Sequence, residues 1–226
     1  MHRRPRSVTP RPTHAVQSSP KKRRAEESRR PTAARREDLS VAIVPLLVRG
    51  RLLVATPPLV DPNFDRSVVL LLEYGEDGAL GIILNRPSDT ALATVLPEWH
   101  ELATAPGVVF SGGPVAPEAV IALARGGADG TVGWVSVLGE VGTVDVARDP
   151  AEIGPQLDAL RIFVGYSGWS PGQLELELEQ EAWFVVATES GDPFSPQPDQ
   201  LWRDVLRRQR GRVAMFANYP EDPETN

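Results

Sequence analysis

The sequence predicts an α+β fold with a mostly antiparallel sheet. Segments with strand character outnumber those with helix character. Many neighbouring strands are joined by links of hairpin length, which favours antiparallel pairing over a doubly wound parallel sheet. At 226 residues the chain has a length at which a single core is the default.

Charge divides the chain into two parts. Residues 1–40 contain 12 Lys and Arg against 4 Asp and Glu, a net charge of +8. Residues 41–226 contain 12 Arg, no Lys and 26 acids, a net charge of −14, and the two sum to −6. Because residues 1–40 have few large apolar side chains, we expect a disordered basic tail, although a misassigned start codon would look the same. We expect one folded domain over residues 41–226.

Strand-like segments open this domain. Apolar runs at 51–59 and 67–74 are bounded by Pro, Asp and Gly, a pattern typical of buried strands. The link Gly75–Gly78 connects the second run to "ALGIILNRP" and predicts a hairpin. From 89 to 102 the apolar residues approach helical spacing, and Pro97 interrupts them, which predicts two short helices.

The second half adds further strands and two capped helices. Asp149 is a predicted N-cap, with Pro150 in the first helical position and Glu152 reaching back. A C-terminal helix ends at Gly211. Its predicted buried stripe is Leu201, Trp202, Val205 and Leu206. The predicted strands are "GVVFSGGP", "AVIALAR", "VGWVSV", "GTVDVA", "RIFVGYSGW" and "AWFVVAT".

The segment "FVGYSGWSPGQLELELEQEAW", Phe163 to Trp183, has two interpretations. Ser167 would serve a serine hydrolase if it lay on a sharp turn beside a general base. The domain offers only His100 as a histidine, and both lysines of the chain lie in residues 1–40. We therefore favour a structural role, with a strand to Tyr166, a turn through Ser167 and Gly168, and then a helix.

This helix is predicted to run from about Pro171 to Gln180. Ser170 is the expected N-cap and Gln173 the residue that reaches back to it, so that Ser170→Ala should cost ~1 kcal/mol. Phe163 and Trp169 are the expected core anchors beside it.

The composition disfavours several classes of site. The chain has no Cys, one His in the domain and no acidic cluster at ligand spacing, so we expect neither a metal nor another cofactor. The Gly-rich "SGGP" and "RGGADG" lack the continuation of a phosphate-binding loop. No apolar run approaches the ~20 residues of a membrane span, and a soluble cytoplasmic protein is the default expectation.

Nucleic-acid binding by the domain is opposed by its net charge of −14. Its C-terminal helix carries several arginines, most of which complement the helix dipole. The basic tail, residues 1–40, remains a candidate for electrostatic contact with phosphates.

Polar residues beside Gly-rich turns form a candidate patch or pocket. Asn85 and Arg86 follow a buried strand, and Ser111 precedes a Gly-Gly pair. If these turns lie side by side, they form a polar patch beside the helix start at Gln173, with Glu175 in its first turn. The alternative is that Asn85 and Arg86 only satisfy backbone carbonyls and a carboxylate such as Glu175, because buried polar groups need partners.

Three ordered motifs, followed by "WFVVAT" and "LWRDVLRR", resemble the YqgE/AlgH family of bacterial proteins. The motifs are "FDRSVVLLLEYGEDGALGIILNRP", "VVFSGGPV" and "RIFVGYSGWSPGQLELEL". The resemblance spans about Gly50 to Asn218 and excludes the basic tail. It implies a strongly bent sheet that forms a barrel-like body with helices packed around it.

The resemblance implies less about function. The AlgH branch has been described as a transcriptional regulator of exopolysaccharide production, and most members have no assigned activity. No catalytic residues can be carried over. We therefore expect a non-enzymatic binding or regulatory domain that acts through a protein or small-molecule partner.

Overall fold

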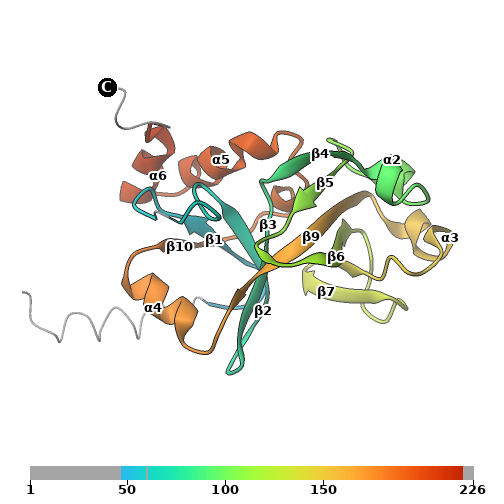
Figure 1. The fold of residues 1–226 in the computed structure, drawn as a ribbon, viewed down its shortest axis with the longest axis horizontal. Helices are drawn as coiled ribbons and strands as arrows, with labels where there is room; N and C mark the ends of the chain where they lie inside the picture. Colours follow the sequence, from blue (N-terminus) through green and yellow to red (C-terminus); the bar gives the residue numbers. More distant parts are fainter. Residues whose placement is uncertain (1–46, 60, 221–226) are drawn as a thin grey trace, which may run out of the picture. The chain divides into compact units, whose positions relative to one another are not determined.

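A curled, mostly antiparallel ten-stranded sheet organises the molecule, as a computed structural model shows (Figure 1). The structure describes residues 47–59 and 61–220. All of these residues belong to one compact unit. The predicted tail, residues 1–40, lies outside the described residues. The predicted α+β class is confirmed.

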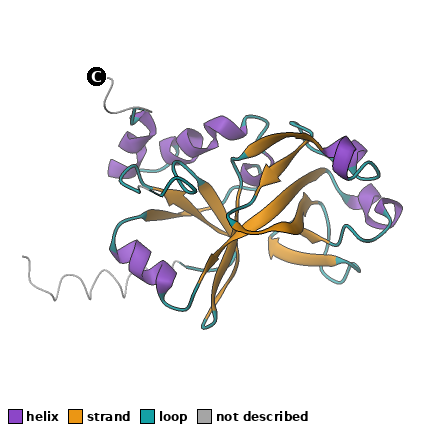
Figure 2. Ribbon diagram, viewed as in Figure 1, coloured by secondary structure: helices purple, strands orange, loops and turns teal. Residues whose placement is uncertain are grey.

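The strands follow one another along most of the chain. They are β1 Arg51–Ala55, β2 Val68–Gly75, β3 Gly78–Ile83, β4 Pro87–Ala91, β5 Val108–Ser111, β6 Val115–Arg125, β7 Trp134–Leu138, β8 Val141–Val144, β9 Ala159–Trp169 and β10 Trp183–Ala187. Their order in the sheet is β10-β1-β2-β3-β9-β6-β8-β7, with β4 paired to β5 and β5 to β9. The sheet curls into a half-barrel, and short helices surround it (Figure 2).

The helices are short. The α-helices are α2 Leu92–Val95, α3 Pro150–Ile153, α4 Gln173–Glu179, α5 Leu201–Arg207 and α6 Arg212–Met215. The 3₁₀ turns are η2 His100–Leu102, η3 Gly154–Gln156, η4 Asp192–Phe194, η5 Pro198–Gln200 and η6 Phe216–Asn218.

Strand β9 joins the two halves of the sheet. Its first half pairs with β6 antiparallel and with β5 parallel, whereas its last three residues pair with β3. The change occurs around Gly165, whose φ of 69° is in the left-handed region that favours glycine. A Cβ on Gly165 would also lie 2.6 Å from the Gly113 carbonyl oxygen, so the close approach of this turn requires glycine.

The core explains why β1 and β2 read as continuous apolar runs. Leu52 and Leu70 face one buried cluster, which α5 covers, and Leu53 and Val69 face another, which α4 covers. Because successive residues of a strand point to opposite faces, a strand covered on both faces is apolar at every position.

The C-terminal helix α5 lies where it was predicted, but it ends at Arg207, and Gly211, the predicted end, is the N-cap of α6. Its predicted stripe, Leu201, Trp202, Val205 and Leu206, is buried. The Trp202 indole N–H donates to the Ala55 carbonyl at 2.8 Å and ties the helix to β1. Arg208 at the C-cap does more than complement the dipole, since its guanidinium pairs with the buried Asp192 at 2.5 Å.

The prediction of a turn at Ser167 and Gly168 was wrong. Strand β9 continues to Trp169 because Ser167 and Gly168 pair with Gly81 and Leu80 of β3. The predicted anchors Phe163 and Trp169 are both buried, in different clusters.

The predicted cap of α4 formed only in part. The Gln173 side chain accepts from the Ser170 backbone N–H at 3.1 Å, as predicted. The N-cap, however, is Gly172 with a φ of 76°, and no side chain caps the helix, so the helix starts later than predicted. The hydroxyl of Ser170 therefore does not provide the expected ~1 kcal/mol.

Two further details differ from the prediction. Residues 89–91 belong to β4, which pairs with β5, so that the helical pattern starts only at Leu92. Asp149 caps α3 as predicted by accepting from Ala151 N–H at 2.9 Å. Glu152 instead pairs with Arg148 at 2.5 Å, because an arginine lies one turn before it.

Arg161 of β9 is a charged residue inside the core, only 2% exposed. Its guanidinium donates to the carbonyls of Ala105, Pro193 and Ser195 at 2.9–3.0 Å. It also lies 4.3 Å from the centroid of the Phe110 ring. Burial lowers the pKa of Arg161 to about 10. Arg161 thus holds two connecting segments against the sheet.

Replacing Arg161 by Met should destabilise the domain by about 2 kcal/mol or more, because three buried carbonyls lose their donor. Urea unfolding followed by circular dichroism measures this loss. Arg125→Met, which removes a more exposed pair with Asp158, is the control and should cost less. Equal midpoints for wild type and Arg161→Met would contradict this role.

Candidate functional site

Arg86, in the link between β3 and β4, lines two cavities. The first cavity, the arginine cavity, has a volume of about 270 Å³. It is lined by Asp65, Arg66, Asn85, Arg86, Asp199, Trp202 and Arg203. The second, the glycine cavity, has a volume of about 220 Å³. It is lined by Pro62, Asn63, Ile83, Arg86, Ser111, Gly113 and Pro114.

The guanidinium of Arg86 is half-buried and bonded to the backbone. It donates to the Asp65 carbonyl and, at 3.5 Å, to its neighbour's carbonyl at Asn85. Burial lowers the pKa of Arg86, and the nearby carboxylates of Asp65 and Asp199 partly oppose this shift. Because a guanidinium carries five N–H donors, these two bonds leave donors for a molecule in the cavities.

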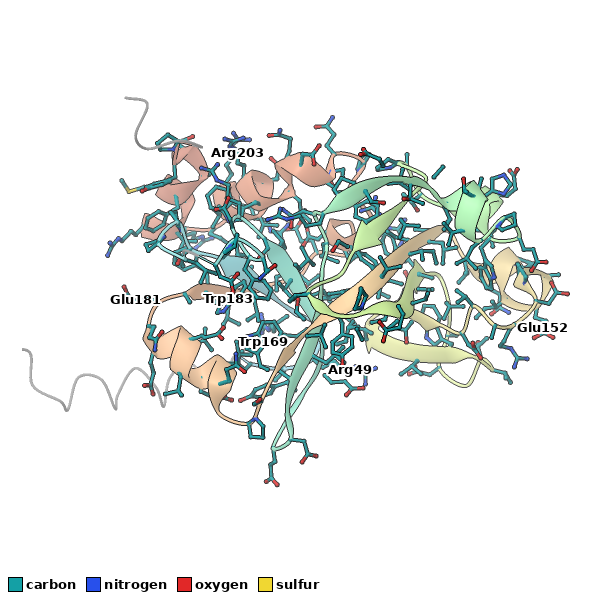
Figure 3. All side chains as sticks on the ribbon, viewed as in Figure 1. Arg49, Glu152, Trp169, Glu181, Trp183 and Arg203 are labelled. Atoms are coloured by element: carbon teal, nitrogen blue, oxygen red, sulfur yellow. The ribbon has the colours of Figure 1, made fainter. Side chains whose placement is uncertain are left out.

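Two further arginines line the arginine cavity. Arg66 has a φ of 49°, its guanidinium lies 5.1 Å from the centroid of the Trp202 ring, and it donates to the carbonyls of Tyr219 and Pro220. Arg203 belongs to α5 and is labelled in Figure 3. Three cations thus meet two carboxylates in one cavity.

Asn85 has a structural role. Its buried side chain accepts from the Val68 N–H at 2.8 Å and donates to the Arg66 carbonyl at 2.9 Å. These bonds fix the loop that carries Asp65 and Arg66. The sequence-based alternative, in which Asn85 satisfies backbone groups, therefore describes this residue correctly.

Ser111 lies beside Arg86, which is the arrangement that the hypothesis of a polar patch required of the two turns. The Ser111 N–H donates to the Arg86 carbonyl at 2.8 Å. Ser111 is exposed and lines the glycine cavity. Gly113 lines the same cavity, and a Cβ there would lie 2.3 Å from the Tyr166 carbonyl group. The Gly-Gly turn is thus pressed against β9 and brings its backbone close to Arg86.

Gln173 and Glu175 are not part of this site. Glu175 accepts from the Tyr74 hydroxyl at 2.6 Å, and Gln173 donates to Glu177 at 3.0 Å. Neither residue lines a cavity that Arg86 lines. The structure therefore groups Asn85, Arg86 and Ser111 and separates the two α4 residues from them.

Helix α4 instead contacts an aromatic cluster through Glu177. The indole N–H groups of Trp169 and Trp183 donate to one oxygen of Glu177 at 2.9 and 2.8 Å (Figure 3). The ring of Phe64 contacts both indoles, with centroids 6.1 and 5.3 Å away. This cluster attaches α4 to the sheet.

Sequence reasoning missed most of the arginine cavity. The missed lining residues are Asp65, Arg66, Asp199, Trp202 and Arg203. Arg66 and Arg203 are 137 positions apart, by subtraction of their residue numbers, and no motif in a single sequence relates them. Arg203 was grouped with the arginines of the C-terminal helix, most of which were explained by the helix dipole.

Ser167 is not an accessible nucleophile. Its side chain is fully buried and its hydroxyl donates to the Gly112 carbonyl at 3.2 Å. The one domain histidine, His100, lies in the exposed η2 turn, where its ring nitrogens contact the Pro97 carbonyl and Glu101. Because Ser167 is buried in a paired strand, it lacks the sharp turn that the serine-hydrolase alternative requires.

The described residues contain neither a metal-binding cluster nor a membrane-spanning helix. Within residues 47–59 and 61–220, no three His, Cys, Asp or Glu side chains are grouped so that they would hold a metal ion. None of the helices in the described part of the chain has the length and apolar character needed to cross a membrane.

The Tyr74–Glu175 pair predicts an observable titration. Burial, the hydrogen bond to Glu175 and the charge of Glu175 raise the pKa of Tyr74 to about 12. The stability linked to Tyr74 is therefore present below its unfolded pKa and is lost as the pH rises through about 12. Glu175→Gln should move the Tyr74 transition to lower pH in an absorbance titration at tyrosinate wavelengths. An unchanged curve would show that Glu175 has no influence.

Comparisons with known proteins match the described domain. A family model described as AlgH-like matches residues 52–214. A UPF0301 protein of Streptomyces coelicolor is 54% identical over 182 residues, which cover 78% of this chain and 94% of that protein. A UPF0301 protein of Rhodococcus jostii is 42% identical over 84% of this chain and 96% of its own length.

Two solved structures share the fold. A crystal structure of a Corynebacterium diphtheriae protein has a TM-score of 0.72 at 31% identity and covers 76% of this chain and 93% of that one. The solution structure of the AlgH protein from Pseudomonas aeruginosa has a TM-score of 0.56 at 28% identity, covering 76% of this chain and 95% of that one. With the family model spanning most of its length, this chain belongs to the AlgH-like family.

Proposed function

We propose that this protein is a non-enzymatic binding domain that recognises a small molecule bearing an anionic group at the Arg86 cleft, by which we mean the arginine and glycine cavities together. Through this ligand or a protein partner it would act as an indirect regulator in the cytoplasm. The regulatory part of this proposal is motivated by the description of the AlgH branch as a transcriptional regulator.

The observation that carries the proposal is the position of Arg86. A half-buried guanidinium faces two cavities, and its side-chain hydrogen bonds given by the structure end on backbone carbonyls. Burial lowers its pKa, so the cationic form lacks part of the solvation that it has in water. A bound anion would restore that stabilisation through charge-assisted hydrogen bonds.

The surroundings of Arg86 favour a ligand with two parts. Arg66, Arg86 and Arg203 line the arginine cavity, and a planar guanidinium suits carboxylate and phosphate oxygens alike. The opposing Asp65 and Asp199 reduce the net charge of this cavity to about +1, which favours a singly charged group over a polyanion. Asn63 and Ser111 in the glycine cavity suit an uncharged polar remainder.

The basic tail is a second, separate candidate. Its charge of +8 supports weak, salt-dependent association of residues 1–40 with nucleic acid. This association would accompany the binding function and does not depend on the Arg86 cleft.

Titration with inorganic phosphate and, separately, with acetate tests the anion site. Amide resonances of residues around Asn85, Arg86 and Ser111 should shift in the full-length protein, and the anion with the lower Kd identifies the preferred group. Arg86→Gln should raise the Kd at least ~10-fold, because a charge-assisted pair is worth about 1.5–3 kcal/mol.

Arg207→Gln is the matched control. Arg207 is an exposed arginine of α5 that pairs with Asp204 at 3.2 Å, outside both cavities. Its removal should leave the Kd within about twofold, as expected for an exposed pair. Two results would contradict a specific site: an equal rise of the Kd in both variants, or chemical-shift changes spread over all the arginines of the protein.

A further inference from the structure

A third and larger cavity lies where the curled sheet comes back on itself. Strand β7 ends the sheet order on one side, and the cavity lies between β7 and the β2–β3 hairpin. Its volume is about 490 Å³. We call it the seam cavity; none of its lining residues belongs to the Arg86 cleft.

The seam cavity has an apolar floor and a charged rim. Leu72, Leu80, Ile121 and Val137 are buried or partly buried and line it from β2, β3, β6 and β7. Arg49, Glu73 and Asp145 are its exposed charged lining residues, and Figure 3 labels Arg49. The floor therefore suits an apolar group, and the rim carries a net charge of −1.

Exposed apolar side chains gather around the seam cavity. The described residues include ten exposed large apolar side chains. Val120 and Val135 line the cavity, and three others are direct chain neighbours of lining residues. These three are Val48, Val132 and Leu138. Half of the exposed large apolar side chains therefore either line the cavity or adjoin a lining residue in the sequence, and exposed apolar groups beside a cavity are typical of an interaction site.

The outer edge of β7 is open beside this patch. In the described part of the chain β7 pairs only with β8. Val135 is opposite Thr143, and the Gly133 carbonyl accepts from the Asp145 N–H at 2.9 Å. Because polar backbone groups alternate in direction along a strand, those of Ser136 point away from β8. At the end of β7, Gly50 packs closely against Leu138, because a Cβ on Gly50 would lie 3.0 Å from the Leu138 Cβ.

The sequence of β7 strengthens this interpretation. Proteins commonly protect an open strand edge with Lys, Pro or another charge. The strand "WVSVL" has none of these, and Val135 on it is 58% exposed. An uncharged edge with exposed valines beside an apolar cavity has the features required for the addition of an extended peptide.

We propose that the seam cavity is a docking site for an extended, basic polypeptide segment of a partner protein. The segment pairs with the edge of β7 near Ser136, inserts one large apolar side chain into the cavity and covers the surrounding valines. Strand pairing would provide affinity and the cavity would select the apolar residue.

Charge selects this occupant over a second copy of the chain. Residues 41–226 carry a net charge of −14 and the full chain one of −6, so the acidic domains of two copies repel each other at low ionic strength. The rim of the cavity is also acidic, because the two negative charges of Glu73 and Asp145 exceed the one positive charge of Arg49. A segment with Lys or Arg on both sides of its apolar residue complements this surface.

The test uses the full chain and two end-blocked synthetic peptides, Lys-Val-Phe-Val-Lys and Glu-Val-Phe-Val-Glu. In ¹H–¹⁵N NMR titrations the basic peptide should shift the resonances of residues 120–121 and 134–137. The acidic peptide should bind at least ~10-fold more weakly at low salt, because screening is then small. Arg86→Gln should leave both results unchanged.

Two matched valines provide the variants. Val135→Lys should weaken binding of the basic peptide at least ~10-fold, since it removes an apolar contact and places a positive charge opposite the lysines of the peptide. Val95→Lys changes a valine on α2 that is 50% exposed, compared with 58% for Val135, and should leave the Kd within about twofold. Both positions are exposed, so both variants should fold.

Several results would overturn the proposal. One is that the basic peptide does not bind at millimolar concentration. The others are that both peptides bind equally well, or that both valine variants raise the Kd of the basic peptide equally. Analytical ultracentrifugation provides one more contradicting result, because a wild-type dimer that Val135→Lys abolishes would identify a second copy as the occupant.

Discussion

The close contact between β9 and the turn at Gly112 and Gly113 is the constraint on which the rest of the structure depends. Just after Gly165, where Tyr166 makes the last pair with β6, the strand changes its partner to β3. The backbone of the turn approaches so closely that a Cβ at Gly112, Gly113 or Gly165 would lie 2.3–2.6 Å from a backbone atom. Only glycine permits this crossing, and the crossing gives the sheet its two halves.

The same contact positions the candidate site. The N–H of Gly112 donates to Val164 and its carbonyl accepts from Ile83 and from the hydroxyl of Ser167. These bonds place the turn against the end of β3, directly before Arg86. The buried Ser167, which in the sequence resembled a nucleophile, therefore supports the turn beside the cleft.

The sequence predicted the parts of the fold that depend on local pattern. Apolar runs gave β1, β2 and the hairpin to β3, and helical spacing gave α5. It failed where pairing partners decide the structure: "SG" at 167–168 reads as a turn, but β3 holds it in a strand. The site divided in the same way. The hypothesis of a polar patch named Arg86 and Ser111 on condition that their turns are adjacent, whereas Arg66 and Arg203 line one cavity only through the tertiary fold.

The two hydrogen bonds of the Asn85 side chain have a consequence for the entropy of ligand binding. By bridging the Arg66 carbonyl and the Val68 N–H, one amide side chain clamps the loop that carries two residues of the cleft. A ligand that enters does not have to order this loop, so little of its binding free energy is spent on reorganisation. Binding of the proposed ligand at such a rigid wall would follow lock-and-key behaviour, with little backbone movement.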